Sequence, residues 1–334
     1  MSRLRTTRFR KLRPGPLHLL LLASTIAATN AHAAEFPSRE VTIYTVSAQG
    51  SGPDVLLRFM GGKLEKVWKQ KVKVENRPGG AGFLAIGAAR REAADGHALL
   101  ELECEHLTAL QHLYKKRNFN ALEVFDPVTA LLKTPFMLAV SSKSPWTGVD
   151  DLIDASAKSP NRVTYGSWGV GSAGHLGGEA LEFAAGVKTA HLPFQDVAQL
   201  YNAVANGDVS WSLASVPSSF DAYRDGRIRY LAIAAPKRID LFPNVPTIAE
   251  AGGPPGVHVE SCAVIVAPKG VPEAVRSQIH RDVQKVLAEP DVREKLRSFA
   301  YEPLTWSAEE IRRNVAQGSK AYESLVKRAN IRLD

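Results

Sequence analysis

The sequence of 334 residues contains only two cysteines, Cys104 and Cys262. Two cysteines are too few for the disulfide framework that holds small secreted domains together. They form no CxxC motif, so no zinc or iron–sulfur site is indicated, and we expect neither a metal nor a cofactor. The two residues are able to pair in an oxidising compartment, but we favour buried free thiols.

Beyond Ala34 the sequence also lacks an apolar run of membrane length, an internal repeat and a low-complexity tract. The hydrophobic fraction of 45% is typical of a globular protein. About 300 residues exceed one ordinary hydrophobic core, so two domains of about 150 residues each are expected.

Acidic residues are missing from the first 34 positions, which hold six basic residues followed by an apolar run from Leu17 to Ala27. Ala31-His32-Ala33 has small residues where signal peptidase requires them. We therefore expect a Sec-type signal peptide over residues 1–33, cleaved after Ala33, and a periplasmic protein. The apolar run is too short for a membrane anchor, which needs about 20 residues. No cysteine follows the cleavage position and no Arg-Arg pair precedes the run, which argues against a lipoprotein and against twin-arginine export.

The net charge of the whole chain is +8, but six of the basic residues lie before Ala34, which leaves the remainder near +2. The basic isoelectric point therefore belongs mostly to the leader. We expect no nucleic-acid partner.

Short β-rich runs alternate with amphipathic helical stretches along the rest of the chain. The strands are predicted at 40–46, 71–75, 98–102, 136–140, 162–167, 189–192, 209–214, 228–234 and 263–267. The helices are predicted at 54–70, 83–94, 146–156, 175–185, 197–206, 272–299 and 308–329. This alternation predicts parallel, doubly wound α/β sheets, which bind ligands at the carboxyl ends of their strands.

Three loops at those strand ends are rich in glycine: residues 49–52, 79–82 and 169–174. Glycine lets the backbone approach a ligand closely, and a helix that follows offers unpaired N–H groups with a partial positive charge. Two facing sets of such groups suit a di- or tricarboxylate, or one carboxylate with a polar tail. The alternative is that these loops are tight turns that need glycine for their geometry alone.

The third loop partly matches the motifs of two enzyme classes. Gly169-Val-Gly-Ser-Ala-Gly174 matches GxGxxG, but the next predicted strand ends without the acid that holds a nucleotide ribose. Ser172 and His175 are close enough in sequence to touch, as a hydrolase nucleophile and base would, but no acid that orients them is evident. The phosphate-binding GxxxxGK[ST] pattern is absent.

Several segments, read in order, resemble one known family. They are Val74–Gly82, Asp95-Gly96 with Leu99-Leu100, Tyr165–Ser172 with His175-Leu176, Gly226–Ala232, and Pro243–Thr247 with Glu250–Gly252. Together they resemble the substrate-binding proteins of the tripartite tricarboxylate transporter family, the Bug-type periplasmic solute-binding proteins. The resemblance covers nearly all of the chain after the leader.

The resemblance implies a type II periplasmic binding-protein fold, in which two doubly wound α/β domains surround a ligand cleft. Domain 1 is expected at residues 34–135 plus 259–334, and domain 2 at 136–258. The implied protein is a non-catalytic monomer that captures a small organic acid: a dicarboxylate, an aromatic acid or an amine-bearing acid. It would deliver this ligand to membrane subunits of a tripartite tricarboxylate transporter, or signal to a sensor kinase. A secreted Ser/His hydrolase that uses Ser172 and His175 is the alternative.

Carried over by position, the resemblance places ligand-binding residues in all three loops. The expected residues are Ser47, Gln49, Gly50, Ser51 and Asp54 in the first loop, Gly79, Gly80 and Ala81 in the second, and Ser167, Trp168, Gly169, Gly171, Ser172 and His175 in the third. Asp208 is a further candidate, either for an amino or hydroxyl group of the ligand or merely as an acid in a turn. Trp168 is expected either to stack on a planar ligand or to pack over the hinge.

The largest departure from the family pattern is Glu101-Leu-Glu-Cys-Glu105. If the strand continues, period-two spacing places all three carboxylates on one face. Like charges this close need solvent, a cation or a basic partner. Our hypothesis is that Glu103 or Glu105 faces the cleft and favours a ligand with an amine or another cation. A solvated strand end is the alternative.

Overall fold

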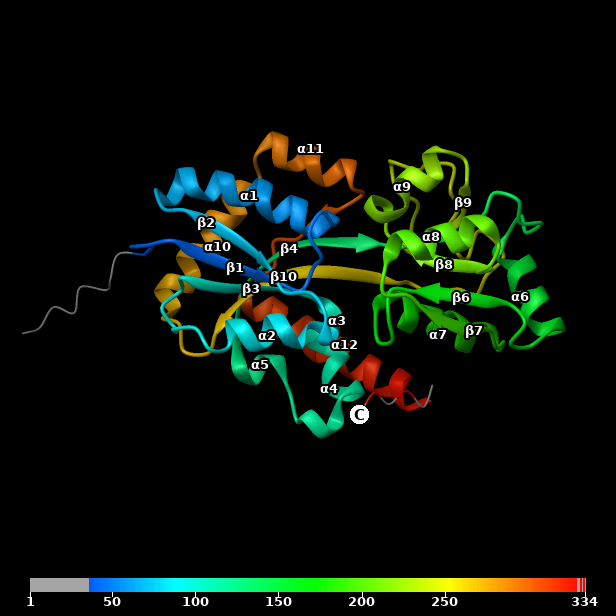
Figure 1. Cartoon of the computed structure of the whole chain (residues 1–334), viewed down its shortest axis with the longest axis horizontal. Helices are drawn as coiled ribbons and strands as arrows, with labels where there is room; N and C mark the ends of the chain where they lie inside the picture. Colours follow the sequence, from blue (N-terminus) through cyan, green and yellow to red (C-terminus); the bar gives the residue numbers. More distant parts are fainter. Residues whose placement is uncertain (1–35, 329–330, 332, 334) are drawn as a thin grey trace, which may run out of the picture. The chain divides into compact units, whose positions relative to one another are not determined.

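The computed structural model describes residues 36–328, 331 and 333, and the expected signal peptide with its cleavage position lies outside them. Within these residues no helix combines the length and the apolar character needed to cross a membrane. The described chain contains two separate β-sheets, each covered by helices on both faces (Figure 1).

The first sheet has six strands in the order β11-β4-β10-β3-β1-β2. Their bounds are β1 Val41–Thr45, β2 Val72–Asn76, β3 Ala98–Glu103, β4 Phe125–Pro135, β10 Glu260–Pro268 and β11 Glu302–Pro303. β1 pairs in parallel with both β2 and β3, so Thr45 lies opposite Asn76 on one side and Glu101 on the other. The carboxyl ends of these three strands therefore meet at one edge of the sheet.

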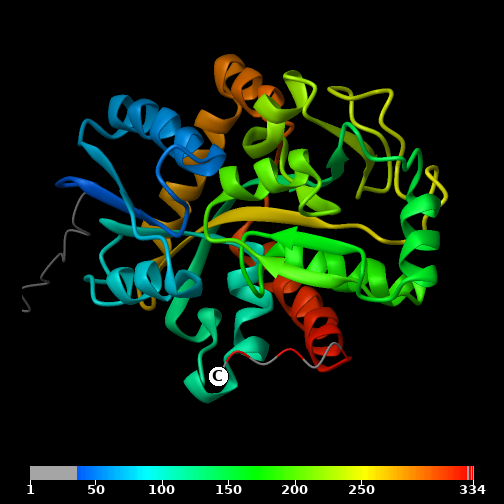
Figure 2. The same ribbon diagram turned by 45° about the vertical axis from the view of Figure 1, so that its right-hand side comes forward.

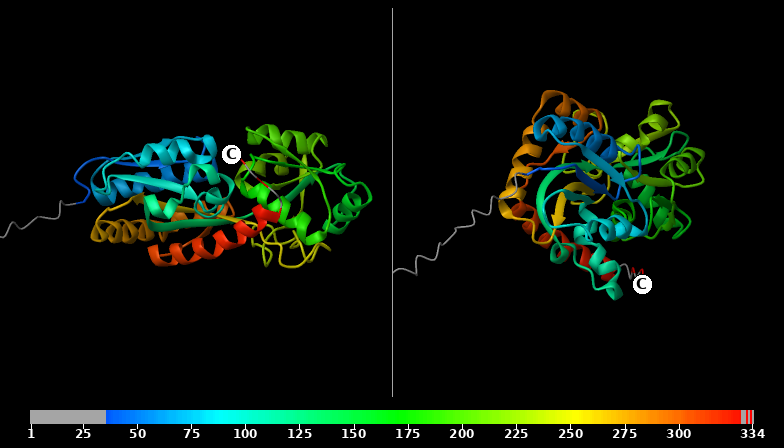
Figure 3. Two further views of the ribbon diagram at one scale, coloured as in Figure 1. Left: turned by 90° about the horizontal axis from the view of Figure 1, so that it is seen from below. Right: turned by 60° about the vertical axis from the view of Figure 1, so that its left-hand side comes forward.

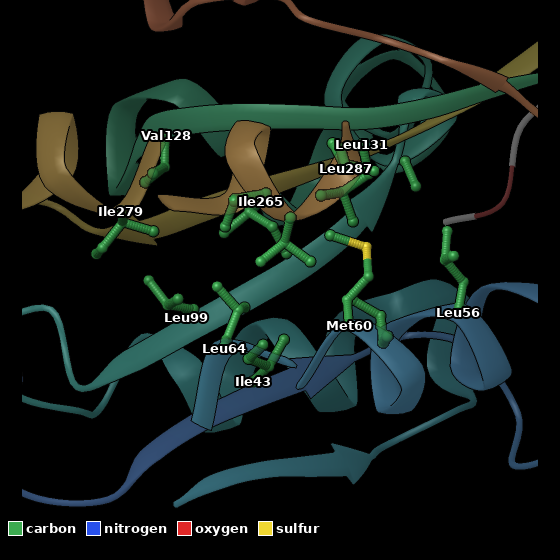
Figure 4. Close-up of a cluster of buried hydrophobic side chains, with 14 of the residues drawn as sticks. Ile43, Leu56, Met60, Leu64, Leu99, Val128, Leu131, Ile265, Ile279 and Leu287 are labelled. Atoms are coloured by element: carbon green, nitrogen blue, oxygen red, sulfur yellow. The ribbon is translucent and has the colours of Figure 1, made fainter. Parts of the chain in front are cut away.

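Helices cover the two faces of the first sheet. They are α1 Gly52–Trp68, α2 Phe83–Ala89, α3 Cys104–Thr108, α4 Leu110–Leu113, α5 Ala121–Val124, α10 Glu273–Leu287, α11 Pro290–Ser298 and α12 Ala308–Arg328, with short 3-10 turns at Gly80–Gly82 and Lys115–Arg117. On one face α1 and α10 pack against β1, β3 and β10 through Met60, Leu64 and Ile279 (Figure 4). On the other face α2 and α12 pack against Leu100 and Leu102. Alternate residues of β3 thus enter different cores, as the pleat of a strand requires.

The second sheet has five strands in the order β7-β6-β8-β5-β9. The elements are β5 Met137–Ser141, α6 Val149–Lys158, β6 Thr164–Ser167, α7 Ala173–Ala185, β7 Ala190–Pro193, α8 Val197–Asn206, β8 Trp211–Ala214, α9 Val216–Arg224 and β9 Ile228–Ile233. β6 lies parallel to β7 and β8, so their carboxyl ends share an edge.

Two adjacent chain segments connect the sheets. One is the passage from β4 into β5, and the other is the segment that leads into the long strand β10 (Figure 2). At this crossing the N–H of Phe136 donates to the carbonyl of Val259, just before β10. A third connection is made by α12, which contacts α7 (Figure 3). A small apolar cluster holds them together: Leu113 of α4, Leu176 of α7 and Val326 of α12 are all buried in it.

Three predictions need correction. Both sheets are mixed rather than wholly parallel, because β10 runs antiparallel to its neighbours and so does β5. The helix predicted over 272–299 is two helices, α10 and α11, since Pro290 starts a new helix and has no N–H to continue the previous one. The predictions also missed β4 and the helices α3, α4, α5 and α9.

The cysteines are also different from the prediction, because Cys104 and Cys262 form a disulfide rather than free thiols. β3 pairs antiparallel with β10 and places Glu103 opposite Ala263. Cys104 directly follows Glu103 and Cys262 directly precedes Ala263, and the Cα atoms of the two cysteines are 5.1 Å apart. That separation lies within the range that a disulfide spans. The pairing of two strands distant in sequence brings the thiols together, and no local sequence signal marks it.

Candidate functional site

The predicted loops lie at the carboxyl edges of the two sheets. Loop 46–51 follows β1, the second glycine loop follows β2, and the third follows β6. The first loop contacts the other sheet's edge directly, because a Cβ placed on Gly52 would lie 3.1 Å from Pro217 of α9 and would collide with the Tyr301 hydroxyl. Loops from the two sheets therefore face each other here.

Asp54 holds the first loop in place. Its buried carboxylate accepts hydrogen bonds from the N–H of Gly50 (2.8 Å), the amide of Asn76 (2.8 Å) and the guanidinium of Arg58 (3.2 Å). Burial opposes ionisation, but these hydrogen bonds keep the pKa of Asp54 below its ordinary value. The predicted contact of Asp54 with a ligand stays a prediction; the contacts that the structure shows are internal and hold the first loop.

The other first-loop residues differ in exposure. Gln49 and Gly50 are exposed at the tip, and Ser51 is half-buried. Ser47 is buried, with its N–H donating to the Thr45 hydroxyl at 3.0 Å. The hydroxyl oxygens of Ser47 and Ser51 have no hydrogen-bond partner among the described residues.

The second loop has an unusual backbone. Gly79, Gly80, Ala81 and Gly82 have φ angles of 103°, 57°, 52° and 85°. Four consecutive residues with positive φ explain why glycine dominates here, and only Ala81 adopts this conformation with a Cβ. A Cβ on Gly82 would collide with the ring of His106, so this glycine is also needed for packing.

In the third loop, Ser167 and Gly169 form an internal hydrogen-bond network. The fully buried Ser167 hydroxyl donates to the carbonyl of Gly169 at 3.0 Å and lies 2.7 Å from Nε2 of His191. The φ angle of Gly169 is 128°, which reverses the chain after β6. Ser167 thus shapes the loop and is not accessible to solvent.

Ser172 and His175 do not form a nucleophile–base pair. Ser172 is the N-cap of α7: its hydroxyl donates to the Gly169 carbonyl (2.7 Å) and accepts from the His175 N–H (3.3 Å). The imidazole Nδ1 of His175 instead accepts from the N–H of Gly171 at 3.0 Å. These contacts order the loop and leave no base directed at the Ser172 oxygen.

The His175 ring stacks on His191 with ring centroids 4.0 Å apart. Burial, with a smaller contribution from His191, lowers the pKa of His175 to about 3, and burial lowers that of His191 to about 4. Both imidazoles are therefore neutral at neutral pH and contribute no positive charge to the site.

Trp168 and Asp208 are placed differently. The Trp168 ring packs against Gly174, and its centroid lies 5.3 Å from that of the Phe136 ring at the crossing between the sheets. This position corresponds to the second expectation for Trp168, packing over the hinge.

Asp208 is exposed in the turn before β8, at the amino end of that strand. The other candidates lie at carboxyl ends, so Asp208 does not join them.

Two helix starts offer unpaired donors. Among the described residues, the N–H groups of Gly52 and Asp54 in α1 and of Ala173 and Gly174 in α7 have no acceptor. Helix N-termini carry a partial positive charge, and unpaired N–H groups there bind anions. Each sheet therefore contributes one helix start with unpaired donors.

The three glutamates are not a solvated strand end. β3 stops at Glu103, and Glu105 lies in the first turn of α3. Glu101 and Glu105 are 0% and 5% exposed, whereas Glu103 is half-buried. Burial, reinforced for Glu101 and Glu105 by the Glu103 carboxyl, raises the pKa of all three above the ordinary value.

Ser215 and Tyr301 also lie near these loops and were not among the predicted residues. Ser215 follows β8 at the same edge as Ser167, and its hydroxyl lies 2.6 Å from that of Ser218. Ser215 directly follows the strand predicted at 209–214, and this position could have marked it as a candidate. Tyr301 lies in the loop after α11, and no local pattern marks its approach to Gly52.

The fold and the loops define the class first. Two α/β sheets connected by paired strands, with glycine loops and helix starts at their carboxyl edges, are the architecture of a periplasmic binding protein. The structure is similar to "periplasmic binding protein BugD", with a TM-score of 0.78 and 24% identity over 89% of this chain and 100% of that one. The expected fold is confirmed.

The chain belongs to the tripartite tricarboxylate transporter family receptors, whose family model matches residues 56–331. A relative from Pseudomonas sp. (strain P51), "UPF0065 protein in tcbD-tcbE intergenic region", is 29% identical over 281 residues, which are 84% of this chain and 83% of the relative. Protein BugT of Bordetella pertussis is 25% identical over 315 residues, 94% and 96% of the two chains.

Two similar solved structures contain acids. "R. palustris Rpa4515 with adipate" has a TM-score of 0.82 and 28% identity, covering 89% of this chain and 100% of that one. MatC from Rhodopseudomonas palustris, with bound malate, has a TM-score of 0.77 and 25% identity, covering 87% and 100%.

Proposed function

We propose that this protein is exported and binds a small carboxylate between the facing edges of its two sheets. The observation that carries the proposal is the pair of helix starts, α1 and α7, whose N–H groups at Gly52, Asp54, Ala173 and Gly174 lack acceptors among the described residues. A carboxylate supplies the acceptors that such groups need. The adipate and malate complexes of two similar structures support this ligand class.

The proposed domains are residues 34–135 plus 259–334 and residues 136–258. Sheet membership supports these bounds, because β4 ends at Pro135 in the first sheet and β5 begins at Met137 in the second. Ligand binding would then close the two domains by a hinge motion at the paired crossing segments.

The proposed protein is not an enzyme. The internal contacts of Ser172 and His175 support this proposal, because neither side chain is left to attack or to deprotonate a substrate. Membership in a family of transporter receptors supports delivery of the ligand to the membrane subunits of a tripartite tricarboxylate transporter.

Thermal unfolding with mono-, di- and tricarboxylates and aromatic acids tests the binding function. A cognate acid at 100 times its Kd should stabilise the fold by about 2.7 kcal/mol and raise Tm. If none of these acids raised Tm, the proposal would fail. Stoichiometric labelling of Ser172 by a serine-reactive probe would instead support the hydrolase.

A further inference from the structure

Glu101, Glu103 and Glu105 form a carboxyl cluster at the carboxyl end of β3, next to the first loop. Thr45 donates to Glu101 at 2.6 Å, and Ser261 donates to Glu105 at 2.8 Å. Each of these hydrogen bonds satisfies only one carboxyl oxygen. The other oxygen, Oε1, of both glutamates is buried without a partner among the described residues.

The cluster has no basic partner within the described residues. The side-chain hydrogen bonds that favour ionisation come only from neutral hydroxyl groups. His106, which follows Glu105 directly, does not supply a charge, because burial lowers its pKa to about 4. Its Nδ1 is also buried without a partner. Ionising all three acids without a cation is costly, because like charges repel and buried charges lose hydration.

A separate residue of the first loop faces the same cluster. Ser47 is 7% exposed, and its hydroxyl oxygen has no partner of good hydrogen-bond geometry among the described residues. The hydroxyl is nevertheless close enough to Glu101 to favour the charged carboxylate and lower its pKa, against the larger effect of burial. Ser47 belongs to the loop that leads into α1, so its hydroxyl, which forms no hydrogen bond of good geometry, lies beside the carboxyl cluster at the edge of the proposed ligand site.

Glu103 is the member that a ligand is able to reach. It is half-buried rather than enclosed, and it makes no side-chain cap bond to α3. Its carboxyl acts electrostatically on both Glu101 and Glu105, and also on Tyr301, which adjoins Gly52 at the start of α1.

We infer that the ligand carries an ammonium group that binds beside Glu103, with its carboxylate held by the unpaired N–H groups of the helix starts. An ammonium group has three donors and no acceptor. The Glu103 carboxylate and the Ser47 hydroxyl are suitable acceptors for it. The ligand class is thus an amino acid in the broad sense, a molecule with one carboxylate and one amine. This inference rests on the proposed function and narrows its ligand.

Isothermal titration calorimetry with matched ligands tests the inference. The probes are a homologous series of ω-amino acids, the diacids of equal length and the monoacids that lack the second charge, for example 6-aminohexanoate, adipate and hexanoate. We expect at least one ω-amino acid to bind about tenfold or more tightly than its matched diacid and monoacid. Glu103→Gln should remove about tenfold of that affinity and leave monoacid binding unchanged. The control is Glu123→Gln, an exposed glutamate of α5, which should change nothing.

The outcomes separate the inference from the function. Tighter binding of diacids, with Glu103→Gln neutral or favourable, would overturn the amine and leave the carboxylate function intact. Equal affinities for an ω-amino acid and its matched diacid and monoacid would also overturn the amine and leave the carboxylate function intact. Binding of no acid would remove both proposals. If Glu103→Gln failed to fold, the comparison of matched ligands on the unmodified protein would still decide.

Discussion

The Thr45 hydroxyl donates a 2.6 Å hydrogen bond to Glu101 across the parallel pair β1–β3, in which the two residues are direct partners. Glu101 is fully buried at the base of the first loop. This contact ties a carboxyl group of one strand to the end of the strand that leads into the proposed ligand site. Burial of Glu101, which outweighs the opposing effect of this hydrogen bond on its pKa, makes the carboxyl sensitive to pH.

Glu101→Gln should change how stability depends on pH. Burial and the Glu103 carboxyl raise the pKa of Glu101 from 4.5 to about 8. The folded state therefore holds a proton that the unfolded state releases, so the contribution of Glu101 to stability is full below pH 4.5 and is lost as pH rises toward 8. The variant should be more stable than the unmodified protein at pH 8, by about 1 kcal/mol or more. Urea unfolding at several pH values measures this. An unchanged difference between pH 5 and pH 8 would contradict it, and Glu123→Gln serves as the control.

Removing the disulfide should destabilise the protein. Cys104 and Cys262 are separated by 158 residues, so the bond strongly restricts the unfolded chain. Cys104→Ser with Cys262→Ser should cost about 2–5 kcal/mol in the free energy of unfolding. Urea unfolding with and without a reductant measures the loss. The reductant should lower the free energy of unfolding of the unmodified protein and leave that of the double variant unchanged. Equal stability of the two proteins in the absence of reductant would refute the prediction.

Gly52→Ala should impair ligand binding and stability together. An added Cβ would collide with the Tyr301 hydroxyl and crowd Pro217 at 3.1 Å, so the first loop has to move away from its contact with α9. We expect destabilisation of about 1–3 kcal/mol and weaker acid binding. Gly62→Ala is a matched control in the same helix, because its Cβ meets nothing within 4 Å. That change should stabilise by up to about 1 kcal/mol. Similar effects of the two substitutions would show that the contact is unimportant.

Asp54→Ala should weaken binding of every ligand by a similar factor. Asp54 makes no contact with the carboxyl cluster, but it holds Gly50 and Asn76 and thereby fixes the first loop. Loss of its charged hydrogen bonds should cost about 1–3 kcal/mol of stability. Asp221→Ala, on a 79%-exposed residue of α9, is the control and should be neutral. A change in preference between diacids and ω-amino acids would instead indicate direct ligand contact by Asp54.

The strand–helix alternation was readable from the sequence because the period of apolar residues is a local property. It located β1, α1, β2 and the three glycine loops, and positive φ at Gly79, Gly80, Gly169 and Gly171 agrees with glycine being required there. The order of motifs indicated the family, which the match over residues 56–331 confirms.

The roles of individual side chains were less predictable. The ligand contacts expected for Asp54, Ser167 and Ser172 stay predictions, and the structure shows that each side chain forms hydrogen bonds with its own or a neighbouring loop. A polar residue in a loop looks the same in sequence whether it binds a ligand or its own backbone. The difference depends on which groups lie within hydrogen-bond distance after folding.

The sequence by itself determined many of the elements, the family and the positions of the three glycine loops, because these depend on local periodicity and on short motifs. Only the tertiary structure decided the Cys104–Cys262 bond and the burial of Glu101 and Glu105. Both depend on β10 returning antiparallel beside β3 from far along the chain. Strand pairing over such a distance is set by the packing of the whole core, which no local pattern records.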